Sequence, residues 1–299
     1  MHDEGIIKIE GKEHKVVNCE KHGKCTIHVI EPALDEESAK RLQGSEVSGK
    51  IDKERRLVLR NHHTGTHIVF ASCKRVLGPH VWQQGAKKTV EYAHLDITHY
   101  DSLTKEQEAK IEAECNKIIL QQIPVKTNFV EKSKAEQLYG YTLYQGGIVP
   151  EREVRVVEIE GVDVEACCGT HCSNTSQVGW IKILKSSRIS DGIVRLYYVA
   201  GTKVLERVRE ERDVIDKLAE MWSTPREDLV ETGEKFFKEY KRLSSFASEM
   251  ERRVLAMHVK VLAEDEKSKR CCVVLPKSLV MSLFIGSLPS FLGKLKVID

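Results

Sequence analysis

The chain contains no long hydrophobic run. A helix that crosses a bilayer needs about 20 consecutive apolar residues, and the nearest approach, residues 278–292, is interrupted by serine, glycine and proline. We find no signal peptide, and the nine cysteines lack the dense, regular spacing of a small disulfide scaffold. We therefore expect a protein without a membrane segment that works in a reducing cytoplasm.

The chain has only a small excess of positive charge. The 47 lysines and arginines nearly balance 45 aspartates and glutamates, which leaves a net charge of +2. Any surface that binds RNA must therefore arise from local clusters of basic residues and not from bulk charge. At 299 residues the chain exceeds the usual size of one compact core, which suggests about two domains.

Two histidines four residues apart, His63 and His67, are the most informative local feature. The apolar residues that follow them predict a helix that ends at Gly78-Pro79. Residues i and i+4 lie on one face of a helix, so the two imidazoles point the same way. Such a pair alone is a weak signal, because two histidines on one helix face are often surface or core residues.

A second pair with the same spacing, Cys167 and His171, follows about a hundred residues later. The alternating stretch 162–166 predicts a strand that delivers Cys167 at its end. Zinc accepts neutral imidazole nitrogen and thiolate sulfur in tetrahedral geometry. We predict one zinc (Zn2+) site formed by His63, His67, Cys167 and His171.

Three neighbouring side chains are rival ligands, namely Cys168, Cys172 and His62. Alternation along a strand points the side chain of Cys168 to the face opposite that of Cys167, so we rank Cys168 below it. Cys172 and His62 also rank below the four chosen residues. The plainer interpretation is a buried free cysteine beside unrelated histidines.

Both motifs resemble the editing domain of alanyl-tRNA synthetases and of the free-standing editing proteins related to them. Residues 63–67, His-Thr-Gly-Thr-His, are similar to the family's His-Thr-Ala-Thr-His, and residues 167–171, Cys-Cys-Gly-Thr-His, to its Cys-Gly-Gly-Thr-His. Residues 78–86, 95–100 and 143–150 resemble segments of the archaeal branch. The resemblance runs from near the first residue to about residue 265.

The sequence departs from the family's pattern at three positions. Gly65 replaces the usual alanine, Cys168 a glycine, and His94 the arginine often found before the Leu-Asp pair. Gly65 slightly weakens the helix, and Cys168 adds a thiol near the expected metal. None of the three changes removes an expected ligand.

The resemblance implies an α+β fold in four segments. We expect a partial β-barrel over 1–58, a zinc-containing α+β editing domain over 59–202, a long helical or coiled-coil arm over 203–270, and the truncated start of a C-terminal domain over 271–299. The editing domain is of the second-additional-domain type shared by threonyl- and alanyl-tRNA synthetases. The parent family binds ATP, but no class II ATP-binding motif precedes the barrel, so we do not expect this polypeptide alone to activate alanine.

Local patterns predict elements inside these segments. Short alternating stretches at 6–9 and 25–30 predict small antiparallel strands. A capping box that opens at Thr104 predicts a helix to residue 122. Two further strands, 181–184 and 193–199, are expected to complete a sheet that carries the second metal pair.

The expected arm opens with a helix start at Thr224-Pro225, in which Thr224 is the N-cap. Apolar residues then alternate four and three positions apart, which is a heptad pattern. Its members are Phe236, Tyr240, Leu243, Ala247, Met250, Val254, Met257 and Val261. The helix either packs on its own domain or mediates contact with a second copy or with a separate synthetase chain.

The resemblance implies a hydrolase that acts on mischarged Ser-tRNA(Ala) and Gly-tRNA(Ala). A pocket shaped for alanine excludes glycine and serine poorly, so a second, hydrolytic site is needed. Recognition of the serine hydroxyl requires polar groups beside the metal, and Thr64, Thr66 and Gln83 are our candidates. The plainer interpretation is two threonines bonded within the helix and a surface glutamine.

Contacts to the acceptor end of tRNA(Ala) are expected from basic and glycine-rich segments. The candidates are Lys87, Lys88, Lys182, Lys185, Arg188 and the turn at 146–147. Two alternative functions stay open: a noncatalytic tRNA-binding or assembly part of a split alanine-tRNA ligase, and a threonyl-type editing domain. A zinc with all four ligands bound could also have a purely structural role and only hold the helix against the sheet.

Overall fold

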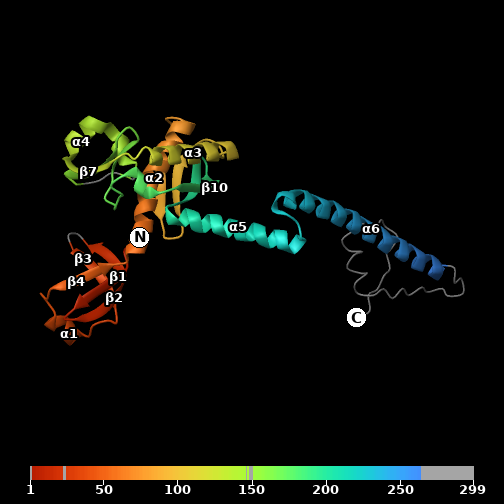
Figure 1. The fold of residues 1–299 in the computed structure, drawn as a ribbon, viewed down its shortest axis with the longest axis horizontal. Coiled ribbons are helices and arrows are strands. Elements are labelled where there is room, and N and C mark those ends of the chain that lie inside the picture. Colours follow the sequence, from red (N-terminus) through yellow and green to blue (C-terminus); the bar gives the residue numbers. More distant parts are fainter. Residues whose placement is uncertain (1, 23–24, 146, 148–150, 264–299) are drawn as a thin grey trace. The chain divides into compact units, whose positions relative to one another are not determined.

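Figure 1 shows the fold in a computed structural model that describes residues 2–22, 25–145, 147 and 151–263. Contacts within the chain divide it into two units, residues 1–213 and 214–299. The expected C-terminal segment 271–299 and Gly146 lie outside the described residues. Within the described part of the chain, no helix combines the length and the apolar character needed to cross a bilayer.

The first segment forms a four-stranded antiparallel sheet in the order β3-β2-β1-β4. Its elements are β1 (Gly5–Ile9), β2 (Lys12–His22), β3 (Cys25–Glu31), α1 (Glu36–Arg41) and β4 (Val47–Ile51). The strands expected from alternation are confirmed, whereas the short helix α1 was not foreseen. Strand pairing does not close a barrel within the described residues, so the sheet is open.

Helix α2 (Lys53–Leu77) is the central helix of the first unit. Asp52 caps it by accepting a hydrogen bond from the Arg55 backbone N–H at 3.0 Å, and Gly78 ends it with φ 121°. The helix therefore begins before the boundary expected at residue 59. This start was not apparent from the sequence, because the first turn after Asp52 is charged and has no apolar periodicity; the domain boundary at residues 58 and 59 stays a prediction.

The main sheet has the order β10-β11-β6-β5, and α2 and α3 pack against it. Its elements are β5 (Gln83–Lys88), β6 (Ala93–Thr98), α3 (Lys105–Leu120), β10 (Ile181–Ser190) and β11 (Ile193–Ala200). The Thr104 capping box is confirmed, because Thr104 Oγ1 accepts from the Gln107 N–H and the Gln107 side chain accepts from the Thr104 N–H. Buried side chains such as Ile68, Leu95 and Leu196 fill the core between helices and sheet.

A second, three-stranded sheet with the order β7-β8-β9 carries the second motif. Its elements and those beside it are β7 (Val125–Glu131), α4 (Lys132–Tyr139), the 3-10 helix η1 (Gly140–Tyr144), β8 (Glu153–Ile159), β9 (Asp163–Ala166) and the 3-10 helix η2 (Thr175–Val178). Cys167 directly follows β9, as expected. The expectation that β10 and β11 complete the sheet behind this pair was wrong, because β10 pairs with β11 and β11 pairs with β6, in the other sheet.

Helix α5 (Thr202–Trp222) crosses from the first unit into the second. In the second unit, the ring of Trp222 packs edge-on against Phe236, with centroids 5.6 Å apart. Thr224 caps no α-helix, because its hydroxyl donates to the Trp222 carbonyl and the 3-10 turn η3 (Arg226–Asp228) comes before α6 (Leu229–Ala263). Much of the apolar surface of α6 is exposed, including Tyr240 and Leu243.

Candidate metal centre

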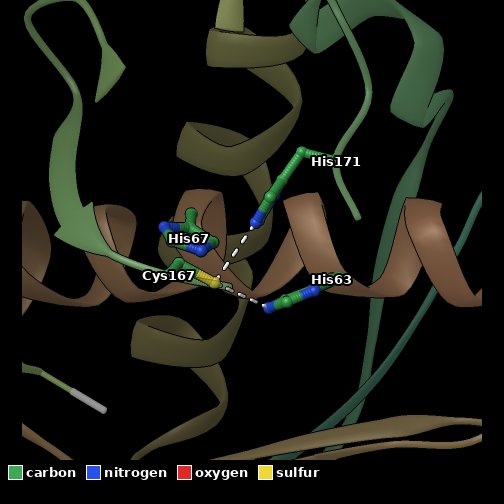
Figure 2. Close-up of side chains that lie close together, drawn as sticks. All are labelled: His63, His67, Cys167 and His171. Carbon is green, nitrogen blue, oxygen red and sulfur yellow. Dashed lines mark hydrogen bonds between the residues drawn. The ribbon is translucent and has the colours of Figure 1, made fainter. Parts of the chain in front are cut away.

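Four side chains from two distant parts of the first unit meet at one point (Figure 2). His63 and His67 come from neighbouring turns of α2, while Cys167 and His171 come from the end of β9 and the loop after it. The Cys167 Sγ atom lies 3.3 Å from Nε2 of His63 and 3.3 Å from Nε2 of His171. One candidate ligand atom from each of the four residues lies within 4.8 Å of all the others. The set therefore contains three imidazoles and one thiol in reach of a single ion.

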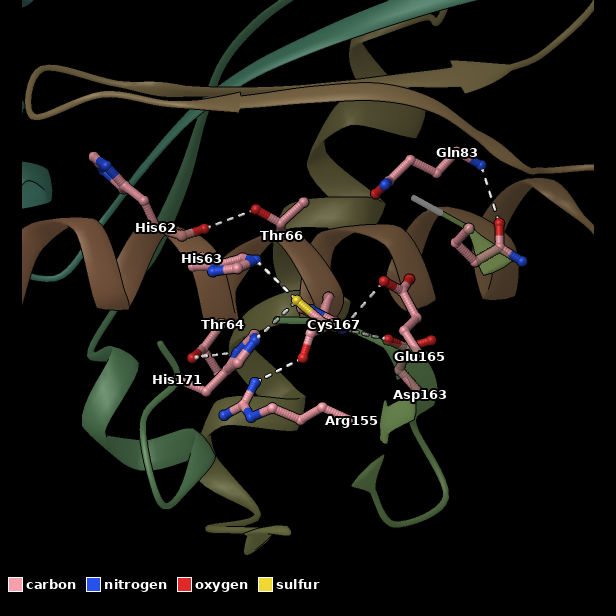
Figure 3. A network of polar contacts seen from close by, with 12 residues as sticks. His62, His63, Thr64, Thr66, Gln83, Arg155, Asp163, Glu165, Cys167 and His171 are labelled. Carbon is pink, nitrogen blue, oxygen red and sulfur yellow. Dashed lines mark hydrogen bonds and ion pairs between the residues drawn. The ribbon is translucent and has the colours of Figure 1, made fainter. Parts of the chain in front are cut away.

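His67 is oriented by two carboxylates of β9, Asp163 and Glu165, which are labelled in Figure 3. Its Nδ1 atom lies 2.7 Å from Asp163 Oδ2 and 3.5 Å from Glu165 Oε2, and all three side chains are largely buried. A proton on Nδ1 is donated to Asp163, which leaves Nε2 available as a ligand. Carboxylates commonly orient metal-binding histidines in this way.

The loop that holds Cys167 is fixed by Arg155 of β8. Its Nη1 atom donates to the carbonyls of Cys167 and Gly169, at 2.7 and 2.8 Å. Gly169 has no room for a side chain, because a Cβ atom there would lie 1.8 Å from Cε1 of His63. The glycine of the second motif therefore allows the loop to approach the first histidine closely.

The electrostatic setting favours the metal-binding forms of His63, His171 and Cys167, whereas it favours the protonated form of His67. Burial lowers the pKa of His63 to about 2 and also lowers that of His171, so both imidazoles are neutral. Burial would lower the pKa of His67 too, but Glu165 and Asp163 raise it well above its usual value. Burial raises the pKa of the Cys167 thiol, yet the hydrogen bond and charge of His67 outweigh this and lower it. Neutral imidazole and thiolate are the forms that zinc binds, and binding releases the remaining proton of His67.

The rival ligands have other surroundings. Cys168 is exposed, as its opposite orientation on the strand suggested. The Cys172 thiol is buried and donates to Oδ1 of Asn61 at 3.4 Å. His62 is buried, and its Nδ1 atom lies 2.8 Å from the Thr89 carbonyl. None of these three belongs to the group of ligand atoms that converge among the described residues.

The three candidates for hydroxyl recognition lie in different settings. Thr64 Oγ1 lies 3.3 Å from Nδ1 of His171 and accepts the Cys172 backbone N–H at 2.9 Å. The Thr66 hydroxyl donates to the His62 carbonyl at 2.9 Å and lies 2.7 Å from the hydroxyl of Tyr198. Thr64 is thus adjacent to a ligand, whereas the hydrogen bonds of Thr66 are made within the core.

Gln83 lies in β5, and Figure 3 draws it above Glu165 and apart from His171. Its backbone N–H donates to Oε1 of Gln145 at 3.2 Å. This contact links β5 to Gln145, the residue that follows η1.

The basic candidates for RNA contact also differ. Lys88 is half-buried and near the centre: burial lowers its pKa, while Cys167 and Glu165 act to raise it. Lys87 is exposed. The remaining three have local partners: Lys182 pairs with Glu211, Lys185 lies over the Tyr197 ring, and Arg188 pairs with Asp191.

Sequence reasoning missed Asp163, Glu165 and Arg155. A usable signal was present for the two carboxylates: Asp163, Glu165 and Cys167 are two residues apart, and alternate residues of a strand share a face. The carboxylates therefore had to lie on the side of β9 that presents Cys167. No local pattern marked Arg155, because it acts across a strand pair on backbone carbonyls.

Comparison with known families identifies a tRNA synthetase accessory domain in part of the chain. Residues 154–197 match the family described as "Threonyl and Alanyl tRNA synthetase second additional domain". This match includes β8, β9, Cys167 and His171 but not α2.

The chain is similar to archaeal alanine-tRNA ligases over most of its length. It is 42% identical to that of Pyrococcus abyssi over 241 residues, which is 80% of this chain and 26% of the relative. It is 43% identical to that of Methanococcus maripaludis strain C5 over 71% of the chain and 24% of the relative, and 38% identical to that of Thermococcus kodakarensis over 88% and 28%. The chain thus spans about a quarter of the length of these relatives. It belongs with the archaeal-type alanyl-tRNA synthetases, in their editing region, as its motifs indicated.

Proposed function

We propose that the chain hydrolyses the ester bond of mischarged Ser-tRNA(Ala) and Gly-tRNA(Ala) at a zinc site. The observation that carries this proposal is the convergence of three imidazoles and one thiol from α2 and the β9 loop, with their ligand atoms within 4.8 Å of one another. The relationship to alanine-tRNA ligases supports tRNA(Ala) as the partner. It also favours alanyl-type over threonyl-type editing.

The residues of the group fit zinc. A His3Cys donor set suits its preference for nitrogen and sulfur, and each ligand except His63 has a polar contact that orients it or its loop. Zinc held there would supply a Lewis acid beside the ester. The chain itself would hold the ligands: Asp163 fixes His67, Thr64 fixes His171, and Arg155 fixes the loop of Cys167.

Discrimination against correctly charged alanine would come from polar groups near the centre. We assign recognition of the serine hydroxyl to Thr64, Thr66 and Gln83, as the sequence suggested. Thr64 is supported by its place beside His171. Thr66 would act through its hydrogen bonds to the His62 carbonyl and Tyr198, which keep this turn of α2 in position.

The test is release of serine from Ser-tRNA(Ala) by the purified chain, with Gly-tRNA(Ala) and Ala-tRNA(Ala) assayed in parallel. We expect the seryl and glycyl esters to be hydrolysed and the alanyl ester to be spared. Cys167→Ala should change the rate, whereas Cys168→Ala, which alters an exposed thiol, should not. Absence of serine release from zinc-loaded, folded protein would contradict the proposal.

Variants of the recognition residues form a second arm of the same assay. Gln83→Ala and Thr66→Val should reduce the preference for seryl over alanyl esters without changing zinc content. If both keep full discrimination, the roles given to these two residues are wrong, while the metal site is unaffected.

A noncatalytic role in binding tRNA or in assembly is the second candidate. The observation that favours it is the exposed apolar surface of α6, where Phe236, Tyr240 and Leu243 are more than half exposed. If this surface joins two copies, the chain should sediment as a dimer, and Leu243→Asp with Met250→Asp should yield monomers that keep any hydrolytic activity. Binding of tRNA(Ala) without hydrolysis would favour this candidate over the first.

A further inference from the structure

The main sheet turns one face toward α2, which contacts β5, β6 and β11, and the other face away from it. Alternate residues of a strand point to opposite faces. In β6, Ala93, Leu95 and Ile97 are fully buried. Leu95 packs in the same core as Ile68 of α2. His94 therefore lies on the outer face, which the sheet separates from α2 and the metal centre, and it keeps some exposure to solvent.

Strand register lines up four side chains across this outer face. Tyr197 of β11 is paired with Lys185 of β10 on one side and with His94 of β6 on the other. His94 is in turn paired with Lys87 of β5. Paired residues of antiparallel strands point to the same face, so one row of side chains crosses all four strands. Because neighbouring strands lie about 4.8 Å apart, the row is about 14 Å long.

The two rings in the middle of the row form an aromatic cluster with Tyr92. The centroid of the Tyr197 ring lies 5.7 Å from that of His94 and 5.7 Å from that of Tyr92. The Tyr92 side chain is 38% exposed. Burial lowers the pKa of His94, and the charge of Arg195 lowers it further, so this ring is neutral at pH 7. Flat, uncharged rings on a sheet are the surface on which unpaired bases stack.

The row ends in a lysine at each side. Lys87 and Lys185 are both exposed, and neither forms an ion pair within the described part of the chain. The Lys185 ammonium lies 4.9 Å from the Tyr197 centroid. Asp96, the acidic residue of β6 on this face, is neutralised by Arg195, whose Nε and Nη2 atoms donate to it at 2.6 and 2.8 Å. The outer face therefore presents uncompensated positive charge on both sides of the rings.

The strand β5 connects this face with the side of the sheet that holds the metal centre. It is an edge strand of the main sheet, and its adjacent residues Lys87 and Lys88 point to opposite faces. Lys88 is paired with the buried Ala93, so its side chain lies on the side of α2. An RNA strand that leaves the metal centre over β5 therefore arrives at the aromatic row.

We propose that the outer face of the main sheet binds single-stranded RNA. Bases stack on the rings of Tyr92, His94 and Tyr197, and the ammonium groups of Lys87 and Lys185 contact phosphates. Unpaired bases are required, because the bases of a duplex are stacked on one another and do not reach the rings. In the proposed function the RNA is tRNA(Ala), and this face is a second contact apart from the metal centre; to that extent the inference rests on the proposed function.

The direct test measures binding of a labelled single-stranded RNA of mixed sequence to the full chain by fluorescence anisotropy. This RNA carries no amino acid ester, so its binding does not depend on hydrolysis. The wild type should bind it saturably and should bind the duplex formed with its complement about tenfold more weakly. Equal binding of the duplex would overturn the inference. No saturable binding of either RNA would also overturn it and would leave this face to a protein partner.

Tyr92→Ala tests the contribution of the rings. The loss of one stacking surface should weaken binding of the single strand about tenfold, whereas Tyr92→Phe, which keeps a ring, should bind like the wild type. Tyr141→Ala is the matched control, because Tyr141 is an exposed tyrosine of η1, outside the main sheet. Unchanged binding by Tyr92→Ala, or an equal loss in Tyr141→Ala, would contradict stacking on this face.

The double variant Lys87→Gln with Lys185→Gln tests the phosphate contacts. Each lysine that neutralises a phosphate of a single strand contributes about 0.7 to the slope of log Kd against log salt concentration. The double variant should therefore lower this slope by about 1.4. Lys110→Gln with Lys117→Gln, which alters two exposed lysines of α3, should leave the slope unchanged. The same slope in the Lys87 and Lys185 variant as in the wild type would contradict the assignment.

Kinetics with Ser-tRNA(Ala) separate this inference from the proposed function. The Lys87 and Lys185 double variant should raise KM about fivefold and leave kcat unchanged, because it removes binding that is uniform through the reaction. Binding of RNA by the wild type without serine release would refute the proposed function and retain the RNA-binding face. Serine release with an unchanged salt slope and an unchanged KM in the double variant would refute the inference alone.

Discussion

The Nδ1 atom of His67 lies 2.7 Å from Oδ2 of Asp163, although the two residues are 96 positions apart in the chain. Asp163 begins β9, and Cys167 follows the end of that strand. One short strand therefore both orients a ligand from α2 and delivers another ligand. A shift in the register of β9 would therefore move both Asp163 and Cys167 and alter the geometry of the whole centre.

Asp163→Ala should weaken zinc binding about tenfold to a hundredfold, because the loss of an orienting carboxylate has this effect at other metal sites. Competition with a chelator of known affinity measures it. Glu160→Ala is the matched control, since Glu160 pairs with Lys126 at the surface. Equal affinities for wild type and Asp163→Ala would show that Glu165 alone orients His67.

Gly169→Ala should damage the centre without unfolding the protein. The added Cβ would lie 1.8 Å from Cε1 of His63, so the loop or the imidazole must move. We expect a loss of zinc affinity of at least tenfold, with little change in circular dichroism. Gly49→Ala is the control, because apart from its two chain neighbours no described residue has an atom within 4 Å of a Cβ at that site. Full zinc affinity in Gly169→Ala would contradict the close approach of this loop to His63.

Gly65→Ala should stabilise the protein. A Cβ at Gly65 would make ordinary contacts of 3.5 Å with Tyr198 and 3.6 Å with Ala200 and Ile181. Alanine is favoured over glycine in a helix interior by about 1 kcal/mol. The free energy of unfolding in urea should rise by about this amount, with zinc content unchanged. A loss of stability would mean that the contacts are tighter than these distances indicate.

The four metal-binding candidates could be predicted because spacing on a helix and alternation on a strand are local rules. His63 and His67 share a face by helical geometry, and Cys167 lies where the alternating pattern stops. The order of strands in a sheet does not follow from local patterns. Nothing in residues 181–199 predicts that β11 pairs with β6, or that β9 pairs with β8 in a separate sheet. The start of α2 was also missed, because the Asp52 cap precedes charged residues.

Glu108 should make stability depend on pH in the acid range. It ties α3 to β10, since its Oε1 atom accepts from the Ser186 N–H at 2.9 Å and from its hydroxyl at 2.6 Å. Burial raises the pKa of Glu108, but hydrogen bonds from Lys105 and Ser186 outweigh it and lower the pKa below its usual value of 4.5. The stabilisation is therefore present above pH 4.5 and is lost as the pH falls through the folded-state pKa.

Glu108→Gln tests this assignment. The variant should be less stable than the wild type by about 1–2 kcal/mol at neutral pH, and the difference should shrink in more acid solution. Glu106→Gln, which alters an exposed ion pair on the same helix, should change stability little. A difference between wild type and Glu108→Gln that does not vary with pH would assign the effect to packing alone.

Zinc content is the measurement that tests the four-ligand centre most directly. Elemental analysis of protein purified without chelator should give about one zinc per chain. His63→Ala, His67→Ala, Cys167→Ala and His171→Ala should each lose most of it or bind it far more weakly, while Cys168→Ala and Cys172→Ala keep it. Wild-type protein without zinc, or equal loss in the Cys168 and Cys172 variants, would contradict the assignment of these ligands.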